Sequence, residues 1–196
     1  MMQNLIVFES KSANLKNVNK IVNGKISKKL EDIKKADKII FPGVGSFESA
    51  VKDISVVKDY LFEHIEKKKP FLGICLGLQL FAENSEESSG VGFSLIKEKI
   101  IKFKNIKTPH MGWNQVNIIK DCSLFKDIPK NSFFYFVHSY YMKINEFTSS
   151  TSIYKNEKEN YLFTSAFQKE YCFGVQFHPE KSSDLGIKLL ENFRRL

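Results

Sequence analysis

The fold of this chain is decided by the stretch Gly73-Ile74-Cys75-Leu76-Gly77, which joins a strand pattern to a helix pattern. Residues 70–74 form a short apolar run typical of a buried strand, and residues 76–82 continue with apolar side chains at helical spacing. A cysteine between two glycines at such a junction is typical of a nucleophile elbow, which places the side chain above the edge of the sheet. Free N–H groups at the start of the helix would favour a thiolate there. The alternative is a buried, inert cysteine in a turn.

A candidate base and its orienting group follow near the C-terminus, in Gly174-Val175-Gln176-Phe177-His178-Pro179-Glu180. A cysteine nucleophile needs a base, and the base needs a group that holds its ring. Residues 175–177 predict a strand. His178 and Glu180 are two residues apart, so an extended chain directs both side chains to the same side. We predict that His178 takes the proton of Cys75 and that Glu180 fixes the tautomer. Taken alone, each would be an ordinary core-edge histidine or surface acid.

A third motif, Phe41-Pro42-Gly43-Val44-Gly45-Ser46-Phe47, follows the apolar strand pattern of residues 38–41. Glycines let backbone N–H groups turn towards a ligand. A cysteine that transfers an acyl group needs such donors for the oxyanion that develops. The candidate donors are the amides of Gly43, Val44, Gly45 and Leu76. Without Cys75 the motif would indicate an ordinary turn.

These three motifs, in this order, resemble those of class I glutamine amidotransferases, the Cys-His-Glu glutaminases. The runs 108–116, 135–141 and 174–182 resemble, more narrowly, the glutaminase subunits of imidazole glycerol phosphate synthases, and Pro109-His110-Met111-Gly112-Trp113-Asn114 is unusually specific. The similarity spans nearly the whole chain. It implies hydrolysis of L-glutamine to glutamate and ammonia through a thioester on Cys75, in histidine biosynthesis, with no cofactor and no metal.

The resemblance also implies which residues bind the substrate. Positions matching Gln79 and Glu87 contact the amino-acid end of glutamine, and backbone groups of Ser139 and Tyr140 hold its carboxylate. A zwitterionic substrate does need an acceptor for its ammonium and N–H donors for its carboxylate. Gln79 could otherwise face solvent, and Glu87 lies in an acidic, serine-rich run that alone indicates a flexible loop.

A synthase or cyclase partner, in a heterodimer, is implied by the same resemblance. Met111 and Trp113 are residue types enriched at interfaces, although they could also pack under a loop. The interface residues implied are Asn14, Asn17, Pro109, His110, Met111, Trp113 and Lys181. A closed interface is chemically sensible, because ammonia released into water would be protonated.

One segment departs from the family pattern. The family usually begins with an aspartate-tyrosine-glycine-x-glycine-asparagine-leucine run, whereas residues 9–15 here read Glu-Ser-Lys-Ser-Ala-Asn-Leu, without the glycines. We expect a more ordinary backbone path for this loop. The departure leaves open a paralogous glutaminase that supplies ammonia for amidation of a nucleotide sugar or surface sugar. Further alternatives are a Cys-His peptidase of similar fold and an inactive binding protein, which Gln79 and the intact Cys75, His178 and Glu180 disfavour.

Composition limits the remaining possibilities. The net charge is +8, from 30 basic and 22 acidic residues, but the lysines are scattered among acids as on a solvated helix face, for instance in residues 25–35. We therefore expect no nucleic-acid partner. No apolar stretch approaches a membrane span and the N-terminus lacks a signal-peptide pattern, so we expect a cytoplasmic protein without membrane contact. Three widely spaced cysteines argue against disulfides and zinc, and Cys122 and Cys172 are expected to be structural.

The order of elements predicts an α/β fold, flavodoxin-like, with a mostly parallel sheet, an antiparallel section and flanking helices. The first half alternates strands at 4–8, 38–41 and 70–74 with helices at 14–23, 47–67 and after Cys75. The second half predicts strands at 93–103, 114–119, 133–141, 151–154, 162–168 and 172–177, then a closing helix at 183–195. We expect one glutamine amidotransferase domain over residues 1–196.

Overall fold

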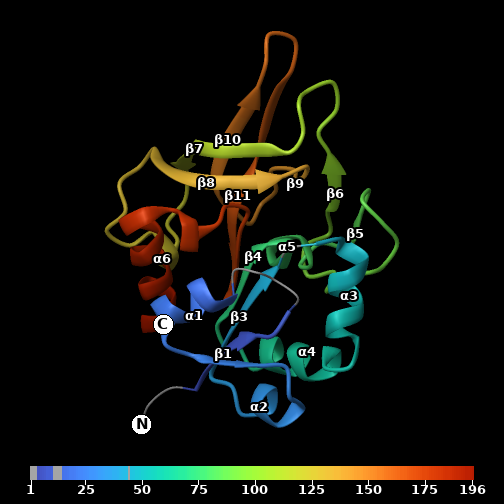
Figure 1. The fold of residues 1–196 in the computed structure, drawn as a ribbon, viewed down its shortest axis with the longest axis vertical. Coiled ribbons are helices and arrows are strands. Elements are labelled where there is room, and N and C mark those ends of the chain that lie inside the picture. The colour runs from blue at the N-terminus through green and yellow to red at the C-terminus, as the bar shows by residue number, and fades with distance from the viewer. Residues whose placement is uncertain (1–3, 11–14, 44) are drawn as a thin grey trace.

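A central mixed sheet organises the computed structural model, which describes residues 4–10, 15–43 and 45–196 (Figure 1). In spatial order, its nine described strands are β2 (Lys25–Ser27), β1 (Leu5–Phe8), β3 (Lys38–Gly43), β4 (Phe71–Cys75), β12 (Cys172–Val175), β11 (Asn160–Lys169), β10 (Thr148–Lys155), β7 (His110–Ile118) and β8 (Ser132–His138). Pairing is parallel from β2 to β12 and antiparallel from β12 to β8. The predicted α/β class is confirmed, with an antiparallel section as wide as the parallel one.

Helices cover both faces of the parallel end. On one side lie α1 (Leu15–Val22) and α6 (Ser183–Arg195), and on the other α2 (Leu30–Lys34), α3 (Phe47–Ser55) and α4 (Lys58–Glu66). The short helix α5 (Leu76–Gln79) follows β4, and 3-10 turns lie at η1 (Ser123–Phe125) and η2 (Pro179–Lys181). A small second sheet joins β5 (Asn84–Ser85), β6 (Lys99–Lys102) and β9 (Tyr140–Met142). No helix in the described ranges is long and apolar enough to cross a membrane.

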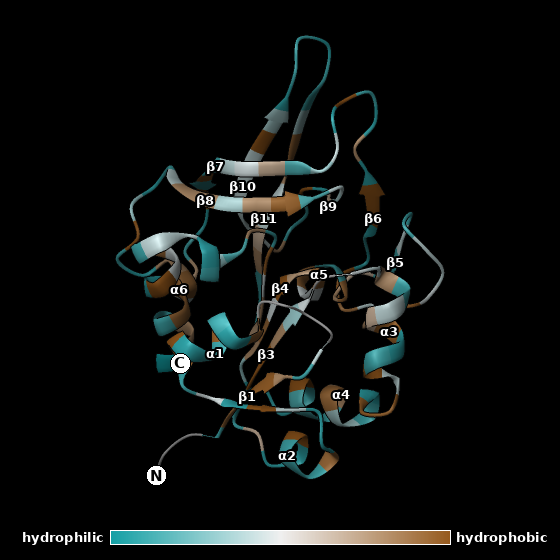
Figure 2. Cartoon of the chain, viewed as in Figure 1, coloured by the Kyte–Doolittle hydropathy of each residue, from teal (hydrophilic) through white to brown (hydrophobic). Residues whose placement is uncertain are grey.

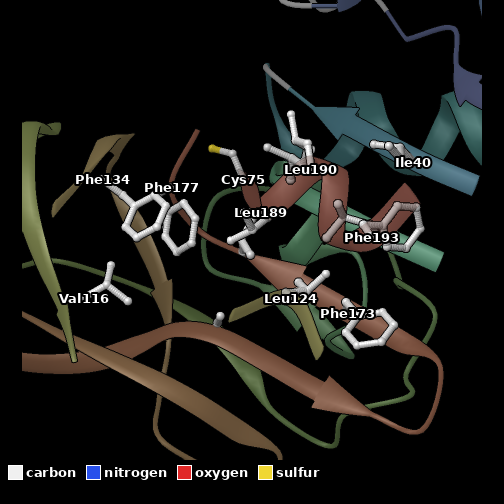
Figure 3. Packing of buried hydrophobic residues seen from close by; sticks show 14 of the residues in the cluster. Ile40, Cys75, Val116, Leu124, Phe134, Phe173, Phe177, Leu189, Leu190 and Phe193 are labelled. Carbon is white, nitrogen blue, oxygen red and sulfur yellow. The ribbon is translucent and has the colours of Figure 1, made fainter. Parts of the chain in front are cut away.

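Alternation along the strands builds two cores, one on each face of the sheet. In β1, Leu5 and Val7 join the cluster under α1 and α6, while Ile6 and Phe8 join the cluster under α2, α3 and α4. Strand β1 is accordingly hydrophobic in Figure 2, whereas the visible face of α1 is hydrophilic. Figure 3 shows Cys75 in the first cluster near Phe177, whose ring stacks on Phe134 at 4.2 Å between centroids.

Several predicted elements differ from the observed ones. The single helix predicted for 47–67 is wrong, because α3 and α4 are separate around Val56 and Val57. This break leaves Val56 85% exposed while Val57 is buried, and adjacent β-branched residues disfavour a continuous helix. Strand β2 was not predicted, because three residues at a sheet edge, only one of them buried, carry little hydrophobic signal.

Three strand predictions in the second half are also too long. The strand predicted at 133–141 is divided at Ser139, because β8 ends at His138 in the large sheet and β9 begins at Tyr140 in the small one. Residues 93–98 form a loop, and the amides of Phe93 and Ile96 donate to the carbonyls of Leu80 and Phe81. The side chains of Phe93 and Ile96 are buried in the core, and only β6, within the predicted range 93–103, is a strand. Strand β12 ends at Val175, and η2 follows His178 directly. Met111 and Trp113 do not pack under a loop, since they belong to β7, which begins at His110.

Strand register brings the candidate catalytic segments together. In the parallel sheet, Cys75 at the end of β4 lies beside Gly43 at the end of β3, and Ile74 lies beside Val175 at the end of β12. The carboxyl ends of β3, β4 and β12 therefore meet at one edge of the sheet. This edge is where open α/β folds form ligand sites.

Candidate active site

The turn at Cys75 has the geometry of a nucleophile elbow. Cys75 has φ 55° and ψ −105°, a region that a non-glycine residue adopts only under strain. A Cβ on Gly73 would lie 2.3 Å from the carbonyl oxygen of Gly77, and a Cβ on Gly77 would lie 2.1 Å from that of Phe41. Both glycines are thus required for the strand, the turn and α5 to pack this closely.

Two groups contact the sulfur of Cys75. The thiol of Cys75 donates to the carbonyl oxygen of Val137 at 3.8 Å, and the side-chain amide of Gln176 donates to Cys75 Sγ at 3.6 Å. Cys75 is only 7% exposed, and it lines a cavity.

His178 and Glu180 form a buried pair next to this cysteine. His178 Nδ1 lies 2.8 Å from Glu180 Oε1, and the side chains are 2% and 1% exposed. Because a carboxylate only accepts, Nδ1 carries the proton, which leaves Nε2 to receive one from Cys75. Among the described residues Nε2 has no hydrogen-bond partner. The pairing follows the prediction, although η2 rather than extended chain produces it.

Strand β8 holds this segment in place. The amide of His178 donates to the carbonyl of Tyr135 at 2.8 Å, and the hydroxyl of Ser182 accepts from the amide of Tyr135 at 2.9 Å. The same hydroxyl donates to the carbonyl of His178 at 2.6 Å. The imidazole is therefore fixed by its backbone as well as by Glu180.

The charges around His178 set its protonation. Burial would lower the pKa of His178, but the charge of Cys75 and the hydrogen bond to Glu180 outweigh burial and raise the pKa to about 10. The folded-state pKa lies above the ordinary value of 6.5. The resulting stabilisation is fully present below about pH 6.5 and is lost as the pH rises through about 10.

We predict that Glu180→Gln lowers the pKa of His178 and reduces glutamine hydrolysis by roughly 10²–10⁴-fold, because the neutral amide removes the charge and the tautomer control. NMR titration of the His178 ring measures the first effect. The free energy of unfolding should also change less between pH 6.5 and 10 in the variant. Glu191→Gln, which alters a surface pair with Arg195, is the matched control. An unchanged titration of His178 in Glu180→Gln would contradict the assignment.

The candidate oxyanion donors lie against the elbow. A Cβ on Gly43 would meet Leu76 Cβ at 2.7 Å and the Gly77 amide nitrogen at 3.0 Å, so the end of β3 touches the start of α5. Leu76 is the first residue of α5, where helix N–H groups have no intrahelical acceptor. Gly45 has φ +112° and lines the cavity. Val44 lies outside the described residues, and its predicted role stays a prediction.

A cavity of about 300 Å³ opens over Cys75. Its lining includes most of the predicted substrate and catalytic residues and two histidines: Gly45, Cys75, Leu76, Gln79, Glu87, Pro109, Val137, His138, Ser139, Tyr140 and His178. Gln79 is buried and donates to the carbonyl of Tyr140 at 3.2 Å and to Gln176 Oε1 at 3.3 Å. Glu87 Oε2 accepts from the amide of Phe47 at 2.6 Å, at the start of α3. The acidic run is therefore anchored at the cavity.

The predicted interface residues lie in different places. Met111 and Trp113 are 62% and 52% exposed on β7, and Lys181 is exposed with Nζ 5.7 Å from the Tyr135 ring centroid. Asn17 is exposed on α1. Asn14 and residues 11–13 of the departing segment 9–15 lie outside the described residues. Pro109 lines the cavity. The prediction that His110 lies at the interface is wrong, because the alternation of side chains along β7 turns His110 inward, where it is buried.

Sequence reasoning missed three groups at this site. Gln176 contacts Cys75, His138 lines the cavity, and the Ser10 hydroxyl donates to the carbonyl of Pro42 at 2.7 Å, beside the oxyanion loop. A polar side chain inside the apolar run 173–177 was an available signal for Gln176. No comparable signal marked Ser10, because its partner is a backbone carbonyl 32 residues away.

The other two cysteines have a different environment. Burial raises the pKa of Cys122 and raises the pKa of Cys172 to about 12, so both remain thiols at neutral pH. Cys75 is thus the one of the three that combines an elbow, an adjacent His-Glu pair and a cavity.

The chain is similar to known proteins over almost its whole length. The family model for class-I glutamine amidotransferases matches residues 5–195. The solved structure of a putative GMP synthase protein from Thermoplasma acidophilum has the same fold, with a TM-score of 0.75 at 17% identity over 100% of this chain and 94% of that one. The chain belongs to the class I glutamine amidotransferase family.

Relatives place the chain more narrowly. It is 47% identical to the imidazole glycerol phosphate synthase subunit HisH of Pyrococcus furiosus, over 100% of both chains. It is 45% identical to the HisH subunit of Methanocaldococcus jannaschii, over 87% of this chain and 86% of the relative. The chain is a glutaminase subunit of the imidazole glycerol phosphate synthase type, an enzyme of histidine biosynthesis.

Proposed function

We propose that Cys75, His178 and Glu180 hydrolyse glutamine in the cavity above the elbow, and that the ammonia passes directly to a cyclase subunit. The observation that carries this proposal is the convergence of the strained Cys75 elbow with the buried His178–Glu180 pair at adjacent strand ends. Backbone strain and buried ionisable pairs are concentrated at functional sites, and here the two occur side by side.

The first half of the reaction forms the thioester. The proton of Cys75 Sγ passes to His178 Nε2, whose raised pKa favours the resulting ion pair, and the thiolate attacks the carboxamide carbon of glutamine. The amides of Leu76 and of the loop at 43–45 stabilise the oxyanion. The tetrahedral intermediate collapses as His178 returns the proton to the leaving nitrogen, so ammonia departs and the acyl group remains on sulfur.

The second half releases glutamate. His178 Nε2, now free, takes a proton from water, which attacks the thioester carbon. The same donors hold the oxyanion, and collapse restores the Cys75 thiol with the proton from His178. Glu180 keeps Nδ1 protonated throughout, so Nε2 is always the atom that exchanges protons.

Substrate polarity matches the rest of the cavity. The carboxylate of Glu87 accepts from the ammonium of glutamine, while backbone groups at Ser139 and Tyr140 bind its carboxylate. Gln79, buried between Tyr140 and Gln176, faces the same space. Binding of the ammonium and the carboxylate of glutamine in this way places its carboxamide at the Cys75 elbow.

The outer face of the β7–β8 pair supports a protein partner. Cross-strand pairs align Met111 with Val137, Trp113 with Tyr135 and Gln115 with Phe133. Met111, Trp113 and Phe133 are all more than half exposed, so this face carries a contiguous apolar patch. Val137 also lines the cavity, which makes the patch continuous with the site where ammonia forms. A cyclase docked here would receive ammonia before water protonates it.

The test uses the full chain with a cyclase subunit, [amide-¹⁵N]glutamine and excess unlabelled ammonium. We expect ¹⁵N in the imidazole product, because the nitrogen travels without mixing with solvent. Trp113→Ala should weaken the complex and reduce ¹⁵N incorporation, since a buried aromatic anchor is lost.

Product that contains only unlabelled nitrogen, despite hydrolysis of glutamine, would overturn direct transfer. Absence of glutamine hydrolysis in the intact complex would overturn the assignment of the site. Ile153→Ala, at an exposed apolar residue on β10, is the control for loss of apolar surface as such.

A further inference from the structure

Two buried histidines face each other between β7 and β8, and the reaction described above does not use them. His110 and His138 are directly paired in the strand register. His110 Nδ1 lies 3.0 Å from His138 Nε2, and the two residues are 4% and 6% exposed. Aromatic rings enclose them, with Phe136 and Tyr154 stacked on His110 at 5.0 and 4.2 Å between centroids.

The hydrogen bonds around this pair determine which ring nitrogens of His110 and His138 carry protons. His138 Nδ1 lies 2.8 Å from the carbonyl oxygen of Tyr140, which only accepts, so Nδ1 is protonated and Nε2 is the acceptor. His110 must then donate from Nδ1, which leaves its Nε2 to accept from the Asn114 amide at 3.1 Å. All four ring nitrogens are satisfied with both rings neutral.

The environment keeps the rings in that state. Burial lowers the pKa of His110 to about 4, and burial together with the neighbouring His110 lowers the pKa of His138 to about 3. Although His138 lines the cavity, its Nε2 is occupied by the proton of His110. It therefore has no free nitrogen with which to act as a base.

A series of hydrogen bonds connects His138 with the nucleophile Cys75. The carbonyl of Tyr140 accepts from His138 and also from Gln79 Nε2. Gln79 donates in turn to Gln176, whose amide contacts Cys75 Sγ. The pair thus connects β7, which carries Met111 and Trp113 on its outer side, with the wall of the cavity.

We propose that His110 and His138 are a positioning pair for glutamine binding: His110 orients His138, and His138 holds the carbonyl of Tyr140 where it fixes Gln79 in the cavity. The inference rests on the proposed function, because Gln79 and Tyr140 are its substrate-binding residues. No proton passes through the pair.

Three variants test this in the full chain bound to the cyclase subunit. His138→Phe keeps the ring volume but removes the donor to Tyr140, and we expect the KM for glutamine to rise roughly 5–30-fold with a smaller change in kcat. His138→Asn keeps an N–H near the Nδ1 position and should restore KM to within about 3-fold of wild type. His110→Phe should give an intermediate rise in KM.

The matched control is His64→Phe. His64 is equally buried, at 4% exposure, and bonds the carbonyl of Pro70 at 3.1 Å in α4, away from the cavity. We expect its KM to remain at the wild-type value. A wild-type KM in a folded His138→Phe variant, or an equal rise in His64→Phe, would overturn the proposal.

¹⁵N NMR of the wild-type chain provides a second readout that needs no activity and no variant. Both rings should show a protonated Nδ1 and an unprotonated Nε2 from pH 8 to pH 5, and a proton on Nε2 of His138 would refute the arrangement. If wild type hydrolyses no glutamine in the complex, the proposed function fails instead, and the NMR result still decides whether the pair exists.

Discussion

Replacement of Cys75 by alanine should reduce glutamine hydrolysis by on the order of 10⁵-fold, while the chain remains folded. The reason is that the thioester cannot form, so His178 and the oxyanion donors have no covalent intermediate to serve. Alanine fits the 7% exposed site without a clash and leaves a small hole that opens into the cavity. Glutamate release from the complex with the cyclase, measured at saturating glutamine, checks the result.

Controls for this variant come from the chain itself. Cys122→Ala and Cys172→Ala should retain hydrolysis, because burial raises the pKa of each thiol and neither lines the cavity over Cys75. A glutamine chloroketone should label Cys75 alone, as peptide mass spectrometry can show. Glutamate release at the wild-type rate in Cys75→Ala, or labelling confined to Cys122 or Cys172, would contradict the mechanism.

The second large effect is expected for Gly77→Ala. The added Cβ would lie 2.1 Å from the backbone oxygen of Phe41, and neither group belongs to a flexible side chain. Strand β3 or helix α5 would have to move, so we expect the free energy of unfolding to fall by about 3 kcal/mol or more. Hydrolysis should be lost as well, since the shift displaces the Leu76 amide. Urea unfolding followed by circular dichroism measures the change.

Gly112→Ala separates this clash from the effect of losing a glycine. Gly112 has φ +128°, and a Cβ there meets no atom within 4 Å, so the variant has backbone strain without overlap. Its cost should be about 1–2 kcal/mol. If Gly77→Ala were no more destabilised than Gly112→Ala, the close packing of the elbow would not be required for the fold.

Much of the architecture was predictable because its signals are local. The apolar run before Cys75, the glycines that flank it and the closing helix at 183–195 each have a residue pattern that specifies one backbone conformation. The closing helix was predicted with the observed bounds. Strand β2 was missed because it depends on pairing with β1, which leaves little pattern in its own three residues. The break at Val56 did have a local signal, the two adjacent β-branched residues, but helical spacing on both sides of it hid the break.

The site divides in the same way. Residue types and a family resemblance were sufficient to name Cys75, His178 and Glu180, and the fold then placed them at adjacent strand ends. His110 shows where prediction from the sequence failed. The resemblance placed it at an interface, but the alternation of β7 turns Met111 and Trp113 outward and His110 inward, against His138.

The primary structure alone indicated the class of fold and a candidate nucleophile, because a strand-to-helix junction with two glycines can be read within five residues. The His178–Glu180 motif and the family resemblance were needed to prefer a nucleophile over an inert cysteine at Cys75. Only the tertiary structure decided which polar groups surround Cys75. The partners of Gln176, Ser10 and His110 lie 28 to 101 residues away along the chain. Strand register determines which of these distant groups come into contact. The side chain that a residue meets across a sheet depends on pairing, and pairing is a property of the folded chain.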